Sequence, residues 1–166
     1  MKWLLLAAVL MATPAFAQPP ANQVSGETLC REIAQREYPN DRRMQNYVYR
    51  KQLSAFKYMK TVKDQDVKKI AIREYMHDFS MQQYVYNKQF SAKQYMKTVK
   101  DLDVKKIALR EYLHDYSMQQ YVYDKQRSAK IYMSTVPDSR AKRQALREYP
   151  FDYSMQKYVH DRQAYR

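Results

Sequence analysis

The sequence predicts an all-α fold built from tandem 37-residue repeats. One stretch, Arg73–Leu109, recurs as Arg110–Leu146, and the two copies match at roughly two-thirds of their positions. Apolar residues in this stretch recur at helical spacing, without the strict alternation of a strand. The chain has a single glycine, Gly26, so it offers few positions for tight β-hairpin turns. A fixed period of this length is typical of repeat proteins, whose units pack on their neighbours.

The repeats also define the expected domain organisation. We expect one helical repeat domain at 26–166, preceded by a flexible N-terminus at 18–25 that contains two prolines. Within the domain, the period predicts a half-repeat at 27–35, full repeats at 36–72, 73–109 and 110–146, and a truncated repeat at 147–166.

The first 17 residues have the features of a secretory signal peptide. Lys2 supplies a positive charge, Trp3–Met11 is apolar, and Ala15-Phe16-Ala17 fits a small-x-small cleavage site. The apolar run is too short to span a bilayer well, and no later segment is apolar enough to do so. We therefore expect an exported protein, in the bacterial periplasm or secreted, with no transmembrane span after cleavage.

Each repeat contains a long helix A, at about Phe79–Val99 in the second copy. The residue before it, Asp78, can accept hydrogen bonds from the free N–H groups of the first turn. The apolar side chains of one face are Met81, Val85, Ala92, Met96 and Val99. Tyr84 and Tyr86 lie about 200° apart around the helix, so only one of them can pack within its own hairpin.

A shorter helix B is expected at about Asp103–Tyr112, with a narrow apolar stripe that includes Val104 and Ile107. Asp101 or Asp103 can cap it, and the corresponding cap in the other copies is Asp64, Asp66 or Asp138. Prolines at 137, 39 and 150 mark the links between helices, because proline is poorly tolerated inside a helix. An open α-solenoid-like array and a compact curled array of helical hairpins both satisfy this pattern.

One element recurs at the start of every helix A, with the form D-x-x-M-Q-x-Y-x-x-x-K/R-Q. It begins at Asp41, Asp78, Asp115 and Asp152. This element resembles a segment of uncharacterised exported proteobacterial proteins. The resemblance covers one helix per repeat and implies no activity.

A polar side chain recurs in the middle of helix A, between apolar positions such as Val85 and Ala92. We interpret this glutamine and the glutamate that closes helix B as a structural polar ladder, with Glu, Arg and Tyr side chains as the expected partners. A row of identical small binding sites is the functional alternative. The predicted ladder consists of Gln52, Gln89, Gln126, Gln163, Glu37, Glu74, Glu111 and Glu148.

Basic residues gather where helix A leads into helix B. Stacked repeats would line these turns along one rim and produce a ridge for an anionic partner, although the same lysines could serve solubility alone. The formal net charge of +13 favours such partners. The predicted ridge consists of Lys60, Lys63, Lys68, Lys69, Lys97, Lys100, Lys105, Lys106, Arg140, Lys142 and Arg143.

The sequence offers no pattern for a metal, a cofactor or a catalytic nucleophile. It contains no Cys/His cluster, no pair of histidines four residues apart, and no glycine-rich phosphate loop. A single cysteine cannot form an internal disulfide. Cys30 aligns with the apolar positions Val67 and Val104, which favours a buried core residue over a reactive thiol.

These observations predict an exported, non-enzymatic binding module that uses repeated basic and tyrosine-bearing helical surfaces. Its partner would be an unidentified protein or an anionic envelope component. The alternative is a peripheral envelope protein that binds anionic lipid, lipopolysaccharide or peptidoglycan by charge. An enzyme is the third possibility, and no motif indicates specific nucleic-acid binding.

Overall fold

The computed structural model describes residues 25–164, with side chains to residue 163. The described residues form eight α-helices and no strand, so the all-α prediction is confirmed. The expected signal peptide at 1–17 lies outside the described residues, as does most of the expected flexible N-terminus. Ser25, which was assigned to that segment, is instead the N-cap of the first helix and accepts a hydrogen bond from the backbone of Thr28.

Long and short helices alternate along the chain. The long helices α2, α4 and α6 have 20 residues each, and α8 has 12. The short helices are α1 (Gly26–Glu37), α3 (Gln65–Glu74), α5 (Leu102–Glu111) and α7 (Arg140–Glu148). The long helices are α2 (Arg42–Thr61), α4 (Phe79–Thr98), α6 (Tyr116–Thr135) and α8 (Tyr153–Ala164).

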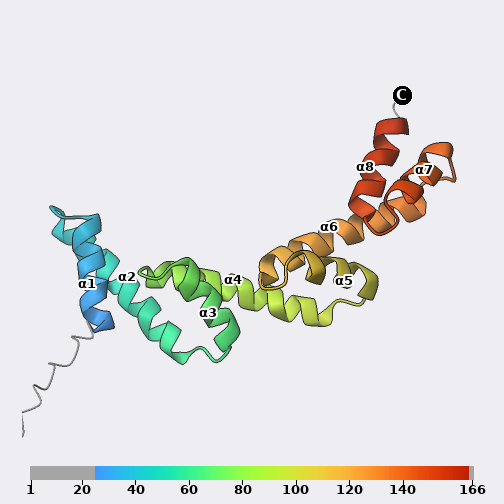
Figure 1. The fold of residues 1–166 in the computed structure, drawn as a ribbon. Coiled ribbons are helices and arrows are strands. Elements are labelled where there is room, and N and C mark those ends of the chain that lie inside the picture. The colour runs from blue at the N-terminus through green and yellow to red at the C-terminus, as the bar shows by residue number, and fades with distance from the viewer. Residues whose placement is uncertain (1–24, 165–166) are drawn as a thin grey trace, which may run out of the picture.

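The helices follow one another along an extended body, with α1 at one end and α8 at the other (Figure 1). Each long helix packs against the next long helix, in the order α2, α4, α6 and α8. Each short helix packs along the long helix that follows it, so that α3 lies on α4 and α5 lies on α6. The closely packed pair is therefore short then long, whereas the sequence suggested a long helix followed by a short one.

The caps explain where the helices begin. Asp41, Asp78 and Asp115 accept backbone hydrogen bonds at the start of α2, α4 and α6, as expected. Asp64 and Asp101 cap α3 and α5 in the same way. The expectation for α7 was wrong. Ser139 caps this helix, because the Asp138 side chain is turned towards an ion pair with Arg143.

Two similar small clusters of buried residues form the core around α3 and α5. Around α3, the buried side chains of Val67, Ile70 and Ala71 pack against Val85 and Tyr86 of α4, and Met59 joins them from the end of α2. The corresponding residues around α5 form the next cluster. Each cluster therefore draws on three successive helices, which explains how an extended body with no central core buries its apolar residues.

The N-terminal pair has a variant of this packing. Cys30 is completely buried on α1, in the place of Val67 and Val104, and burial raises the pKa of its thiol. Gly26 lies so close to the Phe56 ring on α2 that a Cβ atom there would come within 2.1 Å of it. A residue with a side chain at this position would therefore force the Phe56 ring to move.

Candidate binding surfaces

The buried glutamines of the long helices join each long helix to the next. The Gln52 side-chain amide donates to the Asp78 carboxylate at 2.9 Å, and its carbonyl oxygen accepts from the Ser80 backbone at 3.1 Å. The N-cap aspartate Asp78 is thus bound both by its own helix, α4, and by the previous long helix, α2. The same contacts recur as Gln89 with Asp115 and Ser117, and as Gln126 with Asp152 and Ser154.

These partners differ from the ones that the sequence suggested. The glutamates at 37, 74, 111 and 148 are exposed at the ends of the short helices and take no part in the contact. The aspartate takes this place because the start of one long helix lies beside the middle of the previous one. Gln163 on α8 has no equivalent bond within the described part of the chain.

A second series of glutamines, which sequence reasoning quoted only as part of a motif, holds the turn between short and long helices. The Gln82 amide donates to the backbone carbonyls of Tyr75 and Met76, at 2.6 and 3.2 Å. Gln45, Gln119 and Gln156 make the corresponding bond to the tyrosine that ends the preceding short helix. Both series occupy structure-forming positions, which leaves them unavailable for a ligand.

The acidic caps of the short helices are paired with lysines. Lys93 on α4 contacts Asp64 at 2.8 Å and Asp66 at 3.7 Å, and its ammonium lies 5.0 Å from the centre of the Tyr116 ring. Lys130 repeats this arrangement with Asp101, Asp103 and Tyr153. Burial alone would raise the pKa of Asp64. The hydrogen bonds from Lys93 and from the backbone N–H of Val67 outweigh this effect and lower the pKa below its ordinary value.

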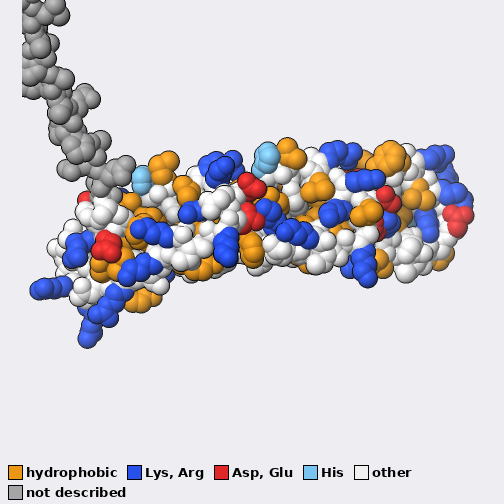
Figure 2. Space-filling view, turned by 90° about the horizontal axis from the view of Figure 1, so that it is seen from below, with side chains coloured by type: hydrophobic (Ala, Val, Ile, Leu, Met, Phe, Trp, Pro, Cys, Tyr) orange, Lys and Arg blue, Asp and Glu red, His pale blue; other side chains and the backbone are white. Residues whose placement is uncertain are grey.

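The predicted basic ridge is only partly a continuous surface. Most of its members are exposed, but Lys142 donates to the carbonyl of Val136, Arg143 pairs with Asp138, and Lys60 lies over the Phe56 ring. On the face seen in Figure 2, basic side chains are scattered over the whole length of the body, between hydrophobic and acidic ones. The exposed members are Lys60, Lys63, Lys69, Lys97, Lys100, Lys106, Arg140 and Arg143, and the half-buried ones are Lys68, Lys105 and Lys142.

A more regular exposed feature lies on the long helices. Tyr47, Tyr84, Tyr121 and Tyr158 are 61, 60, 58 and 55% exposed. Each is followed four residues later by an exposed basic residue, and this spacing places the two side chains side by side on one helix face. We call these four pairs the tyrosine–basic row; the basic members are Lys51, Lys88, Lys125 and Arg162.

By contrast, the second tyrosine of each long helix is buried. Tyr86 is 5% exposed and packs in the cluster around α3, which resolves the expectation that only one of Tyr84 and Tyr86 could pack. Tyr123 occupies the same place beside α5.

Two equivalent pockets of about 480 Å³ lie where a short helix meets the start of a later long helix. The first pocket lies between α3 and α6, and the second between α5 and α8. Each carries a lysine and an arginine four residues apart on the short helix. The first pocket is lined by Asp66, Lys69, Ile70, Arg73, His114 and Tyr116, and the second by Asp103, Lys106, Ile107, Arg110, Phe151 and Tyr153, together with Pro150.

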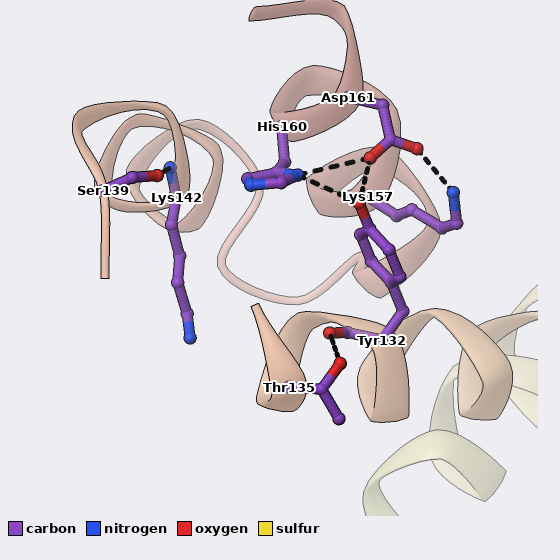
Figure 3. Close-up of polar contacts among 7 residues, drawn as sticks. All are labelled: Tyr132, Thr135, Ser139, Lys142, Lys157, His160 and Asp161. Atoms are coloured by element: carbon purple, nitrogen blue, oxygen red, sulfur yellow. Dashed lines mark hydrogen bonds and ion pairs between the residues drawn. The ribbon is translucent and has the colours of Figure 1, made fainter. Parts of the chain in front are cut away.

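A group of titratable side chains joins α6 to α8 (Figure 3). The side chains of Tyr132, His160, Lys157 and Asp161 point toward one another, and the Asp161 carboxylate accepts from the other three. Burial alone would raise the pKa of Asp161, but the hydrogen bonds from Lys157 and Tyr132 lower it to about 2.

The same bond occurs between earlier helices, as Tyr58 with Asn87 and Tyr95 with Asp124. It is therefore a recurrent link between long helices. A structural role in joining α6 to α8 therefore accounts for the side chains gathered at Asp161.

Residues 25–163 contain no group of three or more His, Cys, Asp or Glu side chains that could hold a metal ion. In the same part of the chain, no helix combines the length and the apolar character that crossing a membrane requires. Comparison of the chain with protein-family models, with curated proteins and with solved structures found no match.

Proposed function

We propose that this protein is an exported, non-enzymatic binding module that contacts an anionic partner through surfaces repeated along a helical array. The observation that carries this proposal is the tyrosine–basic row. All four long helices keep an exposed tyrosine followed four residues later by an exposed lysine or arginine. An aromatic ring beside a cation suits binding to a ligand that has both apolar and acidic groups.

The proposal includes an architecture in which the 37-residue unit is the structural repeat of an open, α-solenoid-like array. The recurrence of the same glutamine–aspartate contact between α2 and α4, α4 and α6, and α6 and α8 supports it. Deleting Arg73–Leu109 is then expected to leave a folded, shorter protein with a helical circular dichroism spectrum. Complete unfolding of this variant would contradict a modular array.

A second candidate is a peripheral envelope protein that binds anionic lipid or lipopolysaccharide by charge alone. The net charge of +13 and the scattered lysine and arginine side chains of Figure 2 favour it. The two candidates differ in what they require. Specific binding needs the tyrosines of the row, whereas charge binding needs only the total number of cations.

Co-sedimentation separates them. The purified protein would be mixed with sacculi, lipopolysaccharide vesicles or anionic liposomes, each at low and at high salt. The row variant Tyr84→Ser/Tyr121→Ser keeps every charge, and the matched charge variant Lys63→Gln/Lys97→Gln/Lys100→Gln keeps every tyrosine. We expect the row variant to lose binding to one fraction and the charge variant to retain most of it.

The opposite result, in which only the charge variant loses binding and high salt abolishes it, would favour the peripheral envelope protein. Absence of binding to all three fractions at low salt would overturn both candidates and direct the search to a protein partner.

A further inference from the structure

The two equivalent pockets beside α3 and α5 have a composition that specifies a ligand class. In the first pocket, Lys69 and Arg73 stand four residues apart on α3, and both are exposed. Neither forms an ion pair within the described residues, whereas Asp66 on the same helix lies 3.7 Å from Lys93. The cluster of Asp64, Asp66, Lys69, Arg73 and Lys93 has three positive and two negative charges, so its net charge is 3 − 2 = +1. The pocket therefore offers two unpaired cations for an anionic group.

The pocket also offers an acceptor. The Asp66 side chain is 75% exposed in spite of its contact with Lys93, and Asp103 in the second pocket is 73% exposed. An ionised carboxylate only accepts hydrogen bonds. A ligand that consists of nothing but an anionic group would be repelled by this carboxylate. A ligand that carries hydroxyl donors beside its anionic group would satisfy both sides of the pocket.

Apart from His114 in the first pocket, the remaining wall is apolar or aromatic. Ile70 is 8% exposed and belongs to the core cluster around α3, and Tyr116 packs against the same cluster. Lys93 lies over the Tyr116 ring, which holds the ring between the core and the pocket. Ile107, Tyr153 and Lys130 repeat this wall in the second pocket. A preformed wall of this kind suits a ligand with a flat apolar face.

The size of the pocket excludes a simple ion as its best occupant. A volume of about 480 Å³ is far larger than a phosphate or a carboxylate group needs, and it lies within the range of small-molecule sites. The arginine fork binds a carboxylate or a phosphate through two parallel hydrogen bonds, and the lysine adds a point charge. A sugar that carries either acid would fill the pocket, with its hydroxyls on the aspartate and a ring face on the apolar wall.

The corresponding positions on α1, in the half-repeat that precedes the first full copy, do not have this composition. Leu29 and Glu32 on α1 occupy the places of Asp66 and Lys69, although Ile33 and Arg36 are retained. The acceptor has been replaced by an apolar side chain and the lysine by an acid. The repeated array thus carries two such pockets one repeat apart, and the corresponding positions on α1 provide an internal comparison.

We propose that these two pockets are subsites for an acidic saccharide, in which Arg73 and Arg110 bind the carboxylate or phosphate and Asp66 and Asp103 accept from sugar hydroxyls. This inference rests on the proposed binding function and names the ligand class of one repeated surface. Two pockets one repeat apart suit a polymer with acidic sugars at intervals.

The test is a titration of the purified protein with glucuronic acid and with glucose 6-phosphate, followed by methyl NMR of the isoleucines. Glucose and inorganic phosphate are the reference ligands, because each carries only half of the proposed recognition groups. We expect the methyl signals of Ile70 and Ile107 to shift with one or both acidic sugars. The methyl signals of Ile33, which occupies the same place on α1, are expected not to shift.

Variants then assign the contacts. Arg73→Gln/Arg110→Gln is expected to weaken binding by about tenfold or more. Arg36→Gln, at the corresponding position of α1, is the matched control and is expected to have no effect. Asp66→Asn/Asp103→Asn is expected to reduce the preference for glucose 6-phosphate over inorganic phosphate. All of these side chains are exposed, and thermal unfolding monitored by circular dichroism verifies that the variants are folded.

Equal shifts with inorganic phosphate and with the sugars would overturn the inference in favour of a plain anion site. Absence of any shift at Ile70 and Ile107 would also overturn it. If envelope fractions still co-sediment with the protein in that case, the proposed binding function stands and only the pockets are excluded. If they do not, the function itself falls.

Discussion

The side-chain amide of Gln89 on α4 donates a hydrogen bond of 2.8 Å to the carboxylate of Asp115, the N-cap of α6. Gln89 is 3% exposed, and its carbonyl oxygen accepts from the backbone of Ser117. One side chain thus fixes where the next long helix begins. Gln89 is buried, and Asp115 and Ser117 are only partly exposed, so loss of the amide leaves these partners short of a hydrogen bond.

We therefore expect Gln89→Leu to lower the free energy of unfolding by about 1–3 kcal/mol, since its half-buried partners lose the hydrogen bonds to the amide. Urea denaturation at pH 7 measures it. The same substitution at the exposed Gln35 of α1 is the control and is expected to change stability by less than about 0.5 kcal/mol. Equal effects at the two positions would show that the contact between α4 and α6 contributes nothing.

The ion pair between Lys93 and Asp64 predicts a pH dependence of stability. The side chains are only 19% and 17% exposed, and their contact raises the pKa of Lys93 and lowers that of Asp64. A carboxyl group whose pKa is lowered by folding stabilises the protein at pH values above the ordinary pKa of that group, which is near 4. This contribution is lost as the pH falls below 4 towards the pKa of the folded state.

Lys93→Met is expected to cost about 2 kcal/mol at pH 7, because it leaves the half-buried carboxylate without its cation. At a pH below the folded pKa of Asp64 the cost should shrink, since the carboxyl is then neutral in both proteins. Lys88→Met, at an exposed position of the same helix, is the control. A cost at Lys93 that does not change between pH 7 and the acid limit would contradict the electrostatic account.

The pKa of Tyr95 is expected to lie well above the ordinary value of a tyrosine. Its hydrogen bond to Asp124, with burial and the charge of that carboxylate, raises its pKa to about 12. A group whose pKa is raised by folding stabilises the native state at pH values below the ordinary pKa of that group, here near 10. This stabilisation is lost as the pH rises towards 12. NMR of tyrosine labelled at the ring carbon that bears the hydroxyl follows the titration.

Asp124→Asn is the decisive variant for Tyr95. It installs the residue that stands at position 87, where Asn87 accepts the equivalent bond from Tyr58 at 2.6 Å. The hydrogen bond can therefore persist while the negative charge is removed, and the pKa of Tyr95 should fall towards 10. An unchanged titration would mean that Asp124 does not control this hydroxyl.

Gly26→Ala tests the close packing of α1 on α2. Alanine favours a helix over glycine by about 1 kcal/mol, but its methyl group would lie within 2.1 Å of the Phe56 ring. Overpacking of this kind typically costs about 1–3 kcal/mol, so we expect a net loss of stability. The Phe56 ring is restricted in how far it can move, because its centre lies 5.0 Å from the centre of the Phe79 ring and the Lys60 ammonium lies over it.

Phe56→Leu provides the complementary background for that measurement. With the ring removed, Gly26→Ala should become neutral or stabilising. A cost that is the same in both backgrounds would place its origin elsewhere in α1.

Helix type and helix limits could be predicted from the sequence because they depend on local chemistry. The aspartate caps mark the starts of α2, α4 and α6, and the linker prolines mark those of α2, α7 and α8. The predicted end of helix A at Val99 is one residue beyond the observed end at Thr98. The pairing of short with following long helices could not be predicted. It depends on how the turn is held, and the Gln82 bond to the backbone of Tyr75 is not apparent from spacing.

The candidate sites show the same limit. Lys69 and Lys106 were included in the predicted ridge, but Arg73 and Arg110, four residues further on, were not. The i, i+4 spacing on the short helix was a signal that could have joined them. Tyr116, which completes the first pocket, comes from the second long helix after α3, and no local pattern places it there.

The measurement that tests the central claim most directly is the affinity of acidic oligosaccharides as a function of their length. If repeated surfaces of one rigid array act together, oligomers of glucuronic acid long enough to reach two pockets should bind about 100-fold or more tightly than the monomer, because the second contact is intramolecular. Arg110→Gln should abolish this gain and leave monomer binding at the remaining pocket. An affinity that rises only in proportion to the number of sugars, in the wild type and the variant alike, would contradict multivalent binding.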